Sequence, residues 1–179
     1  MKYESIADIY SAHELAIERL NATVANIAQR EANALPDGEK WSIQQIVEHV
    51  AMVEQGVSRI CAKLLETAKT VDEPSDGSFV LSDEFSAKST KIAGLKVEAP
   101  ERVHPSGNVS IADALEHIKA NKLTLEAMRP DLERYDLSHA KFPHPFFGDL
   151  TASEWLVMLG GHGSRHTDQI GRILDKIGQ

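Results

Sequence analysis

Apolar residues recur every three or four positions along four long stretches of the chain, a spacing typical of amphipathic helices. These stretches span about residues 6–29, 42–64, 110–129 and 151–177. The first carries apolar residues on or near one face: Ile9, Leu15, Ile17, Leu20, Val24 and Ile27. No part of the sequence shows the sustained alternation of apolar and polar residues that a β-sheet requires. The pattern therefore predicts an all-α protein.

Residue pairs that cap helices mark the start of the last three stretches. The pairs are Ser42 with Gln45, Ser110 with Asp113, and Thr151 with Glu154. We expect the third helix to end before Pro130, because a proline removes a helical hydrogen bond and clashes with the preceding turn. Four helices of this length favour a four-helix bundle, formed as a single domain over residues 1–179.

Two connections between the predicted helices are long. Residues 70–109 separate the second helix from the third, whereas roughly 2–8 residues are usual in bundles. Within this connection we expect a short helix at about Asp83 to Lys91. The segment before the fourth helix is rich in proline and aromatic residues. Long connections of this kind often cover or line a functional site.

Composition narrows the possible partners. The chain has 179 residues and a net charge of -8, with 27 acidic residues against 19 lysines and arginines. Such a surface repels phosphate backbones, so we expect no binding to nucleic acid. No apolar run reaches the roughly 20 residues needed to cross a membrane, and the amino terminus lacks an apolar signal core. The single cysteine fits a reducing compartment, so we expect a cytoplasmic protein with a small-molecule substrate, and a homodimer is compatible with the sequence.

Three histidines lie on the apolar faces of two predicted helices. His162 and His166 are four residues apart in the fourth helix and follow the stripe of Trp155 and Leu159. His49 lies on the apolar stripe of the second helix. Imidazoles one helical turn apart can converge on one ion, and a third from another helix would complete a site for zinc, nickel, cobalt or iron(II). The alternative is that each histidine is a core residue with its own hydrogen-bond partner.

The surroundings of these histidines refine the hypothesis. The sequence from His162 to His166 reads HGSRH and lacks the glutamate of HExxH metalloproteases, which disfavours a protease. Glycines 160, 161 and 163 either leave space for a metal and substrate or allow close helix packing. Four further histidines are expected to face solvent: His13 and His117, which lie beside Glu14 and Glu116, and His139 and His144 of the aromatic segment. The alternative for His139 and His144 is that they reach the site.

The sequence resembles the DinB/YfiT-like superfamily over nearly its whole length. The resemblance rests on WSIQQIVEHVAMVE, on FFGDLTASEWLVMLGGHGSRHTDQIGRI and on the proline-bearing VEAPERVHPSG between them. It implies a four-helix bundle with a long connection between helices 2 and 3. It also implies a divalent metal held by three histidines, which match His49, His162 and His166. Members with assigned activity include S-transferases that use low-molecular-weight thiols and a mycothiol-dependent maleylpyruvate isomerase.

We therefore expect a metal-dependent enzyme, a transferase or hydrolase, that activates water or a low-molecular-weight thiol for attack on a small electrophile. Arg165 is a candidate to bind a substrate carboxylate, with a surface salt bridge as the alternative. Asp168 and Gln169 are candidates to orient an imidazole. A bundle that binds metal or a small ligand without catalysis, with a stress-related role among its options, is the second hypothesis. A helical interaction module with structural histidines is the third.

Overall fold

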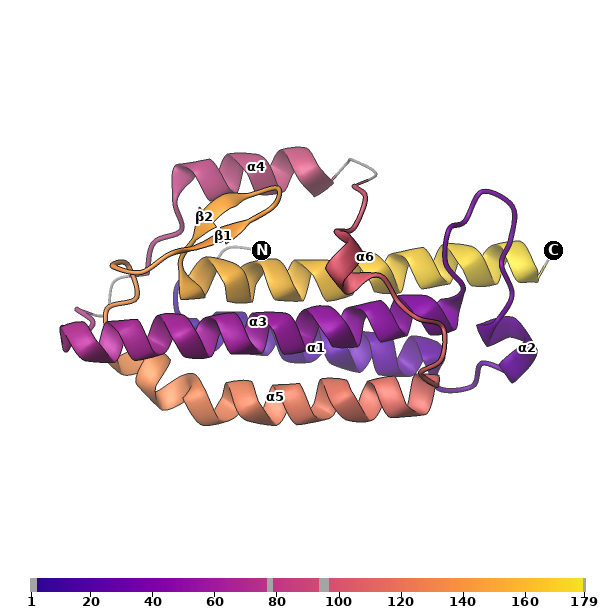
Figure 1. Cartoon of the computed structure of the whole chain (residues 1–179), viewed down its shortest axis with the longest axis horizontal. Coiled ribbons are helices and arrows are strands. Elements are labelled where there is room, and N and C mark those ends of the chain that lie inside the picture. The colour runs from indigo at the N-terminus through magenta and orange to yellow at the C-terminus, as the bar shows by residue number, and fades with distance from the viewer. Residues whose placement is uncertain (1–2, 77–78, 94–96, 179) are drawn as a thin grey trace.

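The four predicted long helices are present in the computed structural model, which describes residues 3–76, 79–93 and 97–178. They are α1 (Ile6–Val24), α3 (Ile43–Val71), α5 (Ile111–Arg134) and α6 (Ala152–Ile177). These helices run side by side in a four-helix bundle, in which α1 packs mainly on α6, and α3 packs on α5 and α6 (Figure 1). Among the described residues, no helix is long and apolar enough to cross a membrane.

The predicted caps explain where three of these helices begin. The Ser42 hydroxyl accepts the Gln45 N–H while the Gln45 side chain accepts the Ser42 N–H, which is a complete capping box. Thr151 and Glu154 form the same box at the start of α6. Ser110 accepts the Asp113 N–H at the start of α5. Each cap satisfies backbone donors that the first helical turn leaves without a partner.

Buried apolar side chains form two core clusters, one in each half of the bundle. The first includes Ile9, Tyr10, Val57, Cys61, Leu125, Leu132, Trp155 and Leu159. The second includes Leu20, Val24, Ile43, Ile46, Val50, Ile118, Ile170 and Ile173. On α6, His162 and His166 lie between these two groups along the chain, whereas His49 of α3 lies within the second group, between Val47 and Val50.

Two predicted helix boundaries were wrong. The first helix ends at Val24 rather than near Gln29, and a separate short helix, α2 (Gln29–Ala32), follows. The chain turns there because Ala28 is extended and its N–H is capped by the Glu31 carboxylate. Leu15, placed on the apolar face by its spacing, is 56% exposed.

The third helix, in contrast, continues through Pro130 to Arg134. The proline forfeits one backbone hydrogen bond, but Leu132, two residues later, is buried in the first core cluster. Burial of a leucine contributes about 1.5–3 kcal/mol, which helps to offset that loss.

The two long connections form a layer over α6 (Figure 1). The first contains α4 (Asp83–Ala93), which confirms the short helix, and a 3-10 turn, η1 (Glu101–Val103). The second contains a hairpin that the sequence analysis missed, in which β1 (Phe142–His144) pairs antiparallel with β2 (Gly148–Leu150). The Trp155 indole N–H donates to the Phe142 carbonyl, and Lys88 of α4 donates to the Phe147 carbonyl. The hairpin is thereby fixed to both α6 and α4.

Candidate metal centre

The structure brings the three predicted histidines together between α3 and α6. His49, His162 and His166 each offer one ring nitrogen, and these nitrogens all lie within 4.8 Å of one another. The Nε2 atoms of His49 and His162 are 3.1 Å apart. Two ligands on a tetrahedral zinc ion, with bonds of about 2.0–2.1 Å, stand roughly 3.3 Å apart. The spacing therefore suits a common metal ion.

His49 is oriented by a backbone carbonyl from the long connection. Its Nδ1–H group donates to the Val103 carbonyl oxygen of η1 at 2.7 Å, and its ring lies against Trp41 with centroids 4.8 Å apart. A proton on Nδ1 leaves the Nε2 lone pair free to bind a metal. The sequence analysis did not identify Val103 or Trp41 as part of the site.

A buried glutamate next to His49 holds this part of the connection in place. The Glu48 carboxylate accepts the backbone N–H groups of Ser106 and Gly107 and the Ser106 hydroxyl, at 2.7–2.9 Å. These three bonds attach the loop after η1 to α3. They help to fix the Val103 carbonyl against His49.

His166 is oriented by Gln169, one of the two residues considered for this role. The Nδ1–H group of His166 donates to the Gln169 side-chain oxygen at 3.0 Å, which again leaves Nε2 for a metal. The expectation for Asp168 was wrong, because its carboxylate pairs with Arg19 at 2.6 Å on the surface. Arg165 is partly buried and close enough to lower the pKa values of His162 and His166.

All three imidazoles are held in their neutral form. Burial is the main cause of the lowered pKa values: that of His49 is below its usual value, that of His166 is about 3, and that of His162 is well below its usual value. Neighbouring imidazoles and Arg165 lower the pKa values of His162 and His166 further. Neutral imidazoles at pH 7 are the form that binds a metal.

The donor set therefore fits a divalent metal, although His162 differs from the other two ligands. Its Nδ1 atom is buried and has no hydrogen-bond partner among the described residues. Hydrogen bonds at Nδ1 thus orient two of the three imidazoles. At the Nδ1 edge of the His162 ring, only packing holds the side chain.

Two of the remaining histidines were placed wrongly. His13 is buried rather than exposed, with its Nε2 atom 2.9 Å from Oε1 of Glu54. His144 is half-buried in the hairpin rather than solvated, and its ring packs on Trp155 with centroids 4.9 Å apart. His117 and His139 are exposed, as expected.

Two of the glycines of α6 lie against α1, as the helix-packing explanation requires. A Cβ atom at Gly160 would lie 3.7 Å from the backbone of His13, and one at Gly163 would lie 3.8 Å from the Ala16 side chain. Both positions face α1 and leave room for a methyl group, whereas a larger side chain would push α6 away from α1. Gly161 is exposed, and a Cβ atom there would meet nothing within 4 Å.

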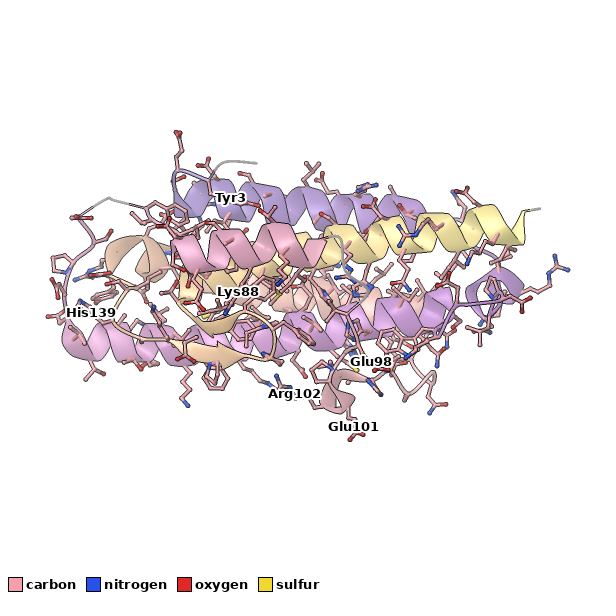
Figure 2. All side chains as sticks on the ribbon, turned by 90° about the horizontal axis from the view of Figure 1, so that it is seen from above. Tyr3, Lys88, Glu98, Glu101, Arg102 and His139 are labelled. Atoms are coloured by element: carbon pink, nitrogen blue, oxygen red, sulfur yellow. The ribbon has the colours of Figure 1, made fainter. Side chains whose placement is uncertain are left out.

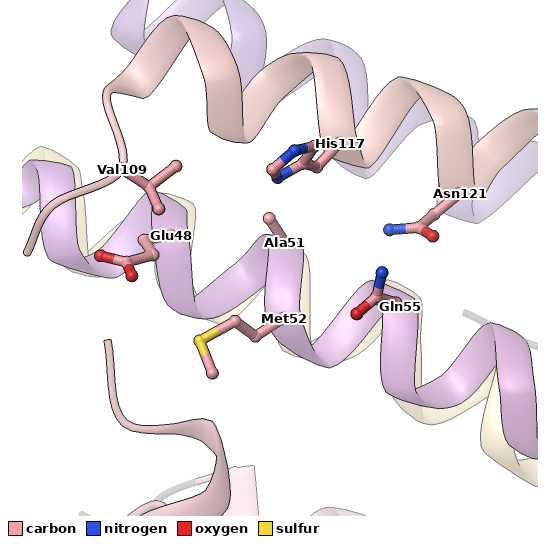
Figure 3. A pocket seen from close by; sticks show the side chains of 7 residues that line it. All are labelled: Glu48, Ala51, Met52, Gln55, Val109, His117 and Asn121. Carbon is pink, nitrogen blue, oxygen red and sulfur yellow. The ribbon is translucent and has the colours of Figure 1, made fainter. Parts of the chain in front are cut away.

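A separate hollow of about 300 Å³ opens between α3 and the first half of α5 (Figure 3). Asn121 of α5 faces Gln55 of α3 across it, and His117 of α5 lies opposite Ala51 of α3. None of the three site histidines lines this hollow. It is therefore distinct from the candidate metal centre.

Comparisons with known proteins agree with this fold. A model of the DinB superfamily matches residues 12–170. The uncharacterized protein YuaE of Bacillus subtilis (strain 168) is 22% identical over 166 residues, which cover 92% of this chain and 96% of YuaE. A crystal structure described as TT2238, a four-helix bundle protein, superposes with a TM-score of 0.59 at 18% identity, over 92% of this chain and 96% of that one. The structural likeness shows the shared fold.

Proposed function

Because the chain belongs to the DinB superfamily, we propose that it is a divalent-metal-dependent enzyme that activates water or a low-molecular-weight thiol for attack on a small electrophile. The observation that supports this most directly is the convergence of three neutral imidazoles from two helices. Three protein ligands are typical of catalytic zinc sites, since a fourth position then stays open for water or substrate.

The residues around the site have separate tasks in this proposal. His49, His162 and His166 would hold the metal, with His49 oriented by the Val103 carbonyl and His166 by Gln169. The bound metal would lower the pKa of a coordinated water or thiol, so that a nucleophile forms near neutral pH. Arg165, partly buried and next to His166 in the sequence, would attract an anionic group of the substrate.

The type of ligand indicates a class of metal rather than one element. Three nitrogen ligands suit zinc, nickel, cobalt or iron(II) rather than the oxygen-seeking magnesium or calcium. The net charge of -8 argues for a small molecule rather than a nucleic acid as the substrate. We propose that this reaction takes place in the cytoplasm, where low-molecular-weight thiols are reduced. The proposal is compatible with a monomer or a homodimer.

An assay of metal-loaded protein tests the proposal. Tag-free protein is stripped with a chelator, loaded separately with zinc, nickel, cobalt or iron(II), and supplied with a thiol plus an activated aryl halide, or with an activated ester alone. We expect thiol consumption or ester hydrolysis that needs metal and is lost in His162→Ala. His117→Ala removes an exposed histidine instead and should keep full activity. Equal turnover without metal would contradict the proposal.

One result would favour the non-catalytic alternative. Protein that binds one metal ion per chain through the three histidines, yet turns over none of the thiol or ester substrates, would be a metal- or ligand-binding bundle. Protein that binds no metal under any loading condition would leave the histidines as core residues.

A further inference from the structure

His144 has a defined tautomer because of where it stands in the hairpin. Its Nδ1 atom accepts the backbone N–H groups of Phe146 and Phe147, at 3.1 and 3.3 Å. A ring nitrogen that accepts hydrogen bonds carries a lone pair, so the proton of the neutral ring is on Nε2. The Nε2–H group points away from the turn whose amides occupy Nδ1.

The ring is also held rigidly. It packs on Trp155 of α6 and on Phe147, with centroids 4.9 Å away in each case. The hairpin itself is tied to α6 through the Trp155 indole and to α4 through Lys88, which lies beside it in Figure 2. A hydrogen-bond donor fixed in this way loses little conformational entropy when it engages a ligand.

The charge state of His144 is fixed as well. Burial, as the main cause, and the Arg102 guanidinium, as a smaller one, together lower the pKa of His144 to about 4. The imidazole is therefore neutral near pH 7. A neutral ring of this tautomer always offers an N–H donor at Nε2.

His144 and the three site histidines border the same region of the molecule. Trp155, against which His144 packs, lies on the face of α6 that carries His162, about two turns or roughly 10 Å before it. His144 is close enough to His162 to lower its pKa. Arg102 belongs to η1, next to the residue that orients His49, and lies on the side of η1 toward the hairpin in Figure 2.

We propose that the Nε2–H group of His144 donates a hydrogen bond to an oxygen atom of the electrophile bound in front of the three imidazoles. This inference rests on the proposed function and adds a substrate class to it, namely an acyl or other carbonyl compound. Attack by a nucleophile places negative charge on a carbonyl oxygen, and a fixed neutral donor stabilises that charge. Neither the sequence pattern nor the three-histidine set assigns this role.

Binding of a carbonyl-bearing probe to cobalt-loaded protein tests the proposal. Acetohydroxamate is titrated into the cobalt protein and followed by visible absorption, which reports the coordination of the metal. His144→Phe keeps an aromatic ring but lacks the donor, and loss of one hydrogen bond should weaken probe binding about five- to tenfold. His144→Gln supplies an N–H donor on a shorter side chain and should restore part of the affinity.

A matched control and a metal-free measurement complete the test. His139→Phe makes the same exchange at an exposed position and should leave probe affinity unchanged. Nitrogen-15 NMR of the metal-free protein at pH 7 should show His144 protonated at Nε2 alone. Probe affinity unchanged in His144→Phe, or a proton on Nδ1, would overturn this inference while leaving the proposed function intact. Wild-type protein that binds no cobalt would overturn both.

Discussion

His13 Nε2 lies 2.9 Å from Oε1 and 3.1 Å from Oε2 of Glu54, and this contact joins α1 to α3 inside the bundle. The two side chains are only 6% and 2% exposed. They lie between the two apolar core clusters along the chain. A buried polar group without a partner is costly, so each side chain depends on the other.

Removing one member of this pair should destabilise the protein. We expect His13→Ala or Glu54→Ala to lower the free energy of unfolding by about 2–4 kcal/mol, because the partner stays buried without its hydrogen bond. The double variant His13→Ala/Glu54→Ala leaves neither group buried without its partner and should lose less stability than the sum of the two single variants. Urea unfolding of the four proteins measures this, and additive losses in the single and double variants would contradict the pairing.

The pair also shows what the sequence could and could not reveal. Glu14 was a poor guide to His13, because adjacent residues of a helix point about 100° apart. The spacing of apolar residues in the first helix did indicate that His13 faces the core, since His13 follows Ile9 by four positions and precedes Leu20 by seven. That the partner is Glu54 depends on how α1 and α3 pack, which spacing within one helix cannot provide.

The convergence of the three histidines was predictable for a related reason. His162 and His166 are fixed relative to each other by helix geometry, and His49 lies on the apolar face that must turn inward. The Val103 carbonyl was not predictable, because a backbone oxygen has no sequence signature and the long connection sets its position. The strands of the hairpin contain only three residues each, too few to show an alternating pattern.

Gln169→Ala should weaken metal binding, and Asp168→Ala should not. Gln169 orients His166, and loss of such a partner typically costs about 10–100-fold in metal affinity. Asp168, the neighbouring residue, pairs with Arg19 on the surface and serves as the matched control. Competition with a chromophoric zinc chelator measures both affinities. Equal affinities in the two variants would show that the Gln169 contact does not orient His166.

Cys61 should make the folded protein sensitive to alkaline pH. Its thiol is fully buried, and burial raises its pKa from 9.0 to about 12. Between these values the unfolded chain binds fewer protons than the folded one, so stability is complete below about pH 9 and falls as the pH rises. This group contributes a loss of about 1.4 kcal/mol per pH unit over that window.

Comparison with Cys61→Ala isolates this contribution. Urea unfolding at pH 8, 9, 10 and 11 should show a steeper decline for the wild type than for the variant. The thiol should also resist iodoacetamide at pH 8 in the native protein and react once urea unfolds it. Rapid alkylation of the native protein, or parallel pH profiles, would contradict a buried, protonated thiol.

Substitutions at two adjacent glycines of α6 should have opposite effects on stability. Gly161 is exposed with open space around its Cα, so Gly161→Ala should stabilise the helix by about 0.5–1 kcal/mol. Gly160 faces the backbone of His13, so Gly160→Val should force α6 away from α1 and cost about 1–3 kcal/mol. Thermal unfolding of the metal-free variants measures the two effects. Zinc affinity of Gly161→Ala, which lies next to His162, then tests whether this glycine leaves room for the metal and its ligand: weakened affinity would show that it does, and unchanged affinity would exclude that role.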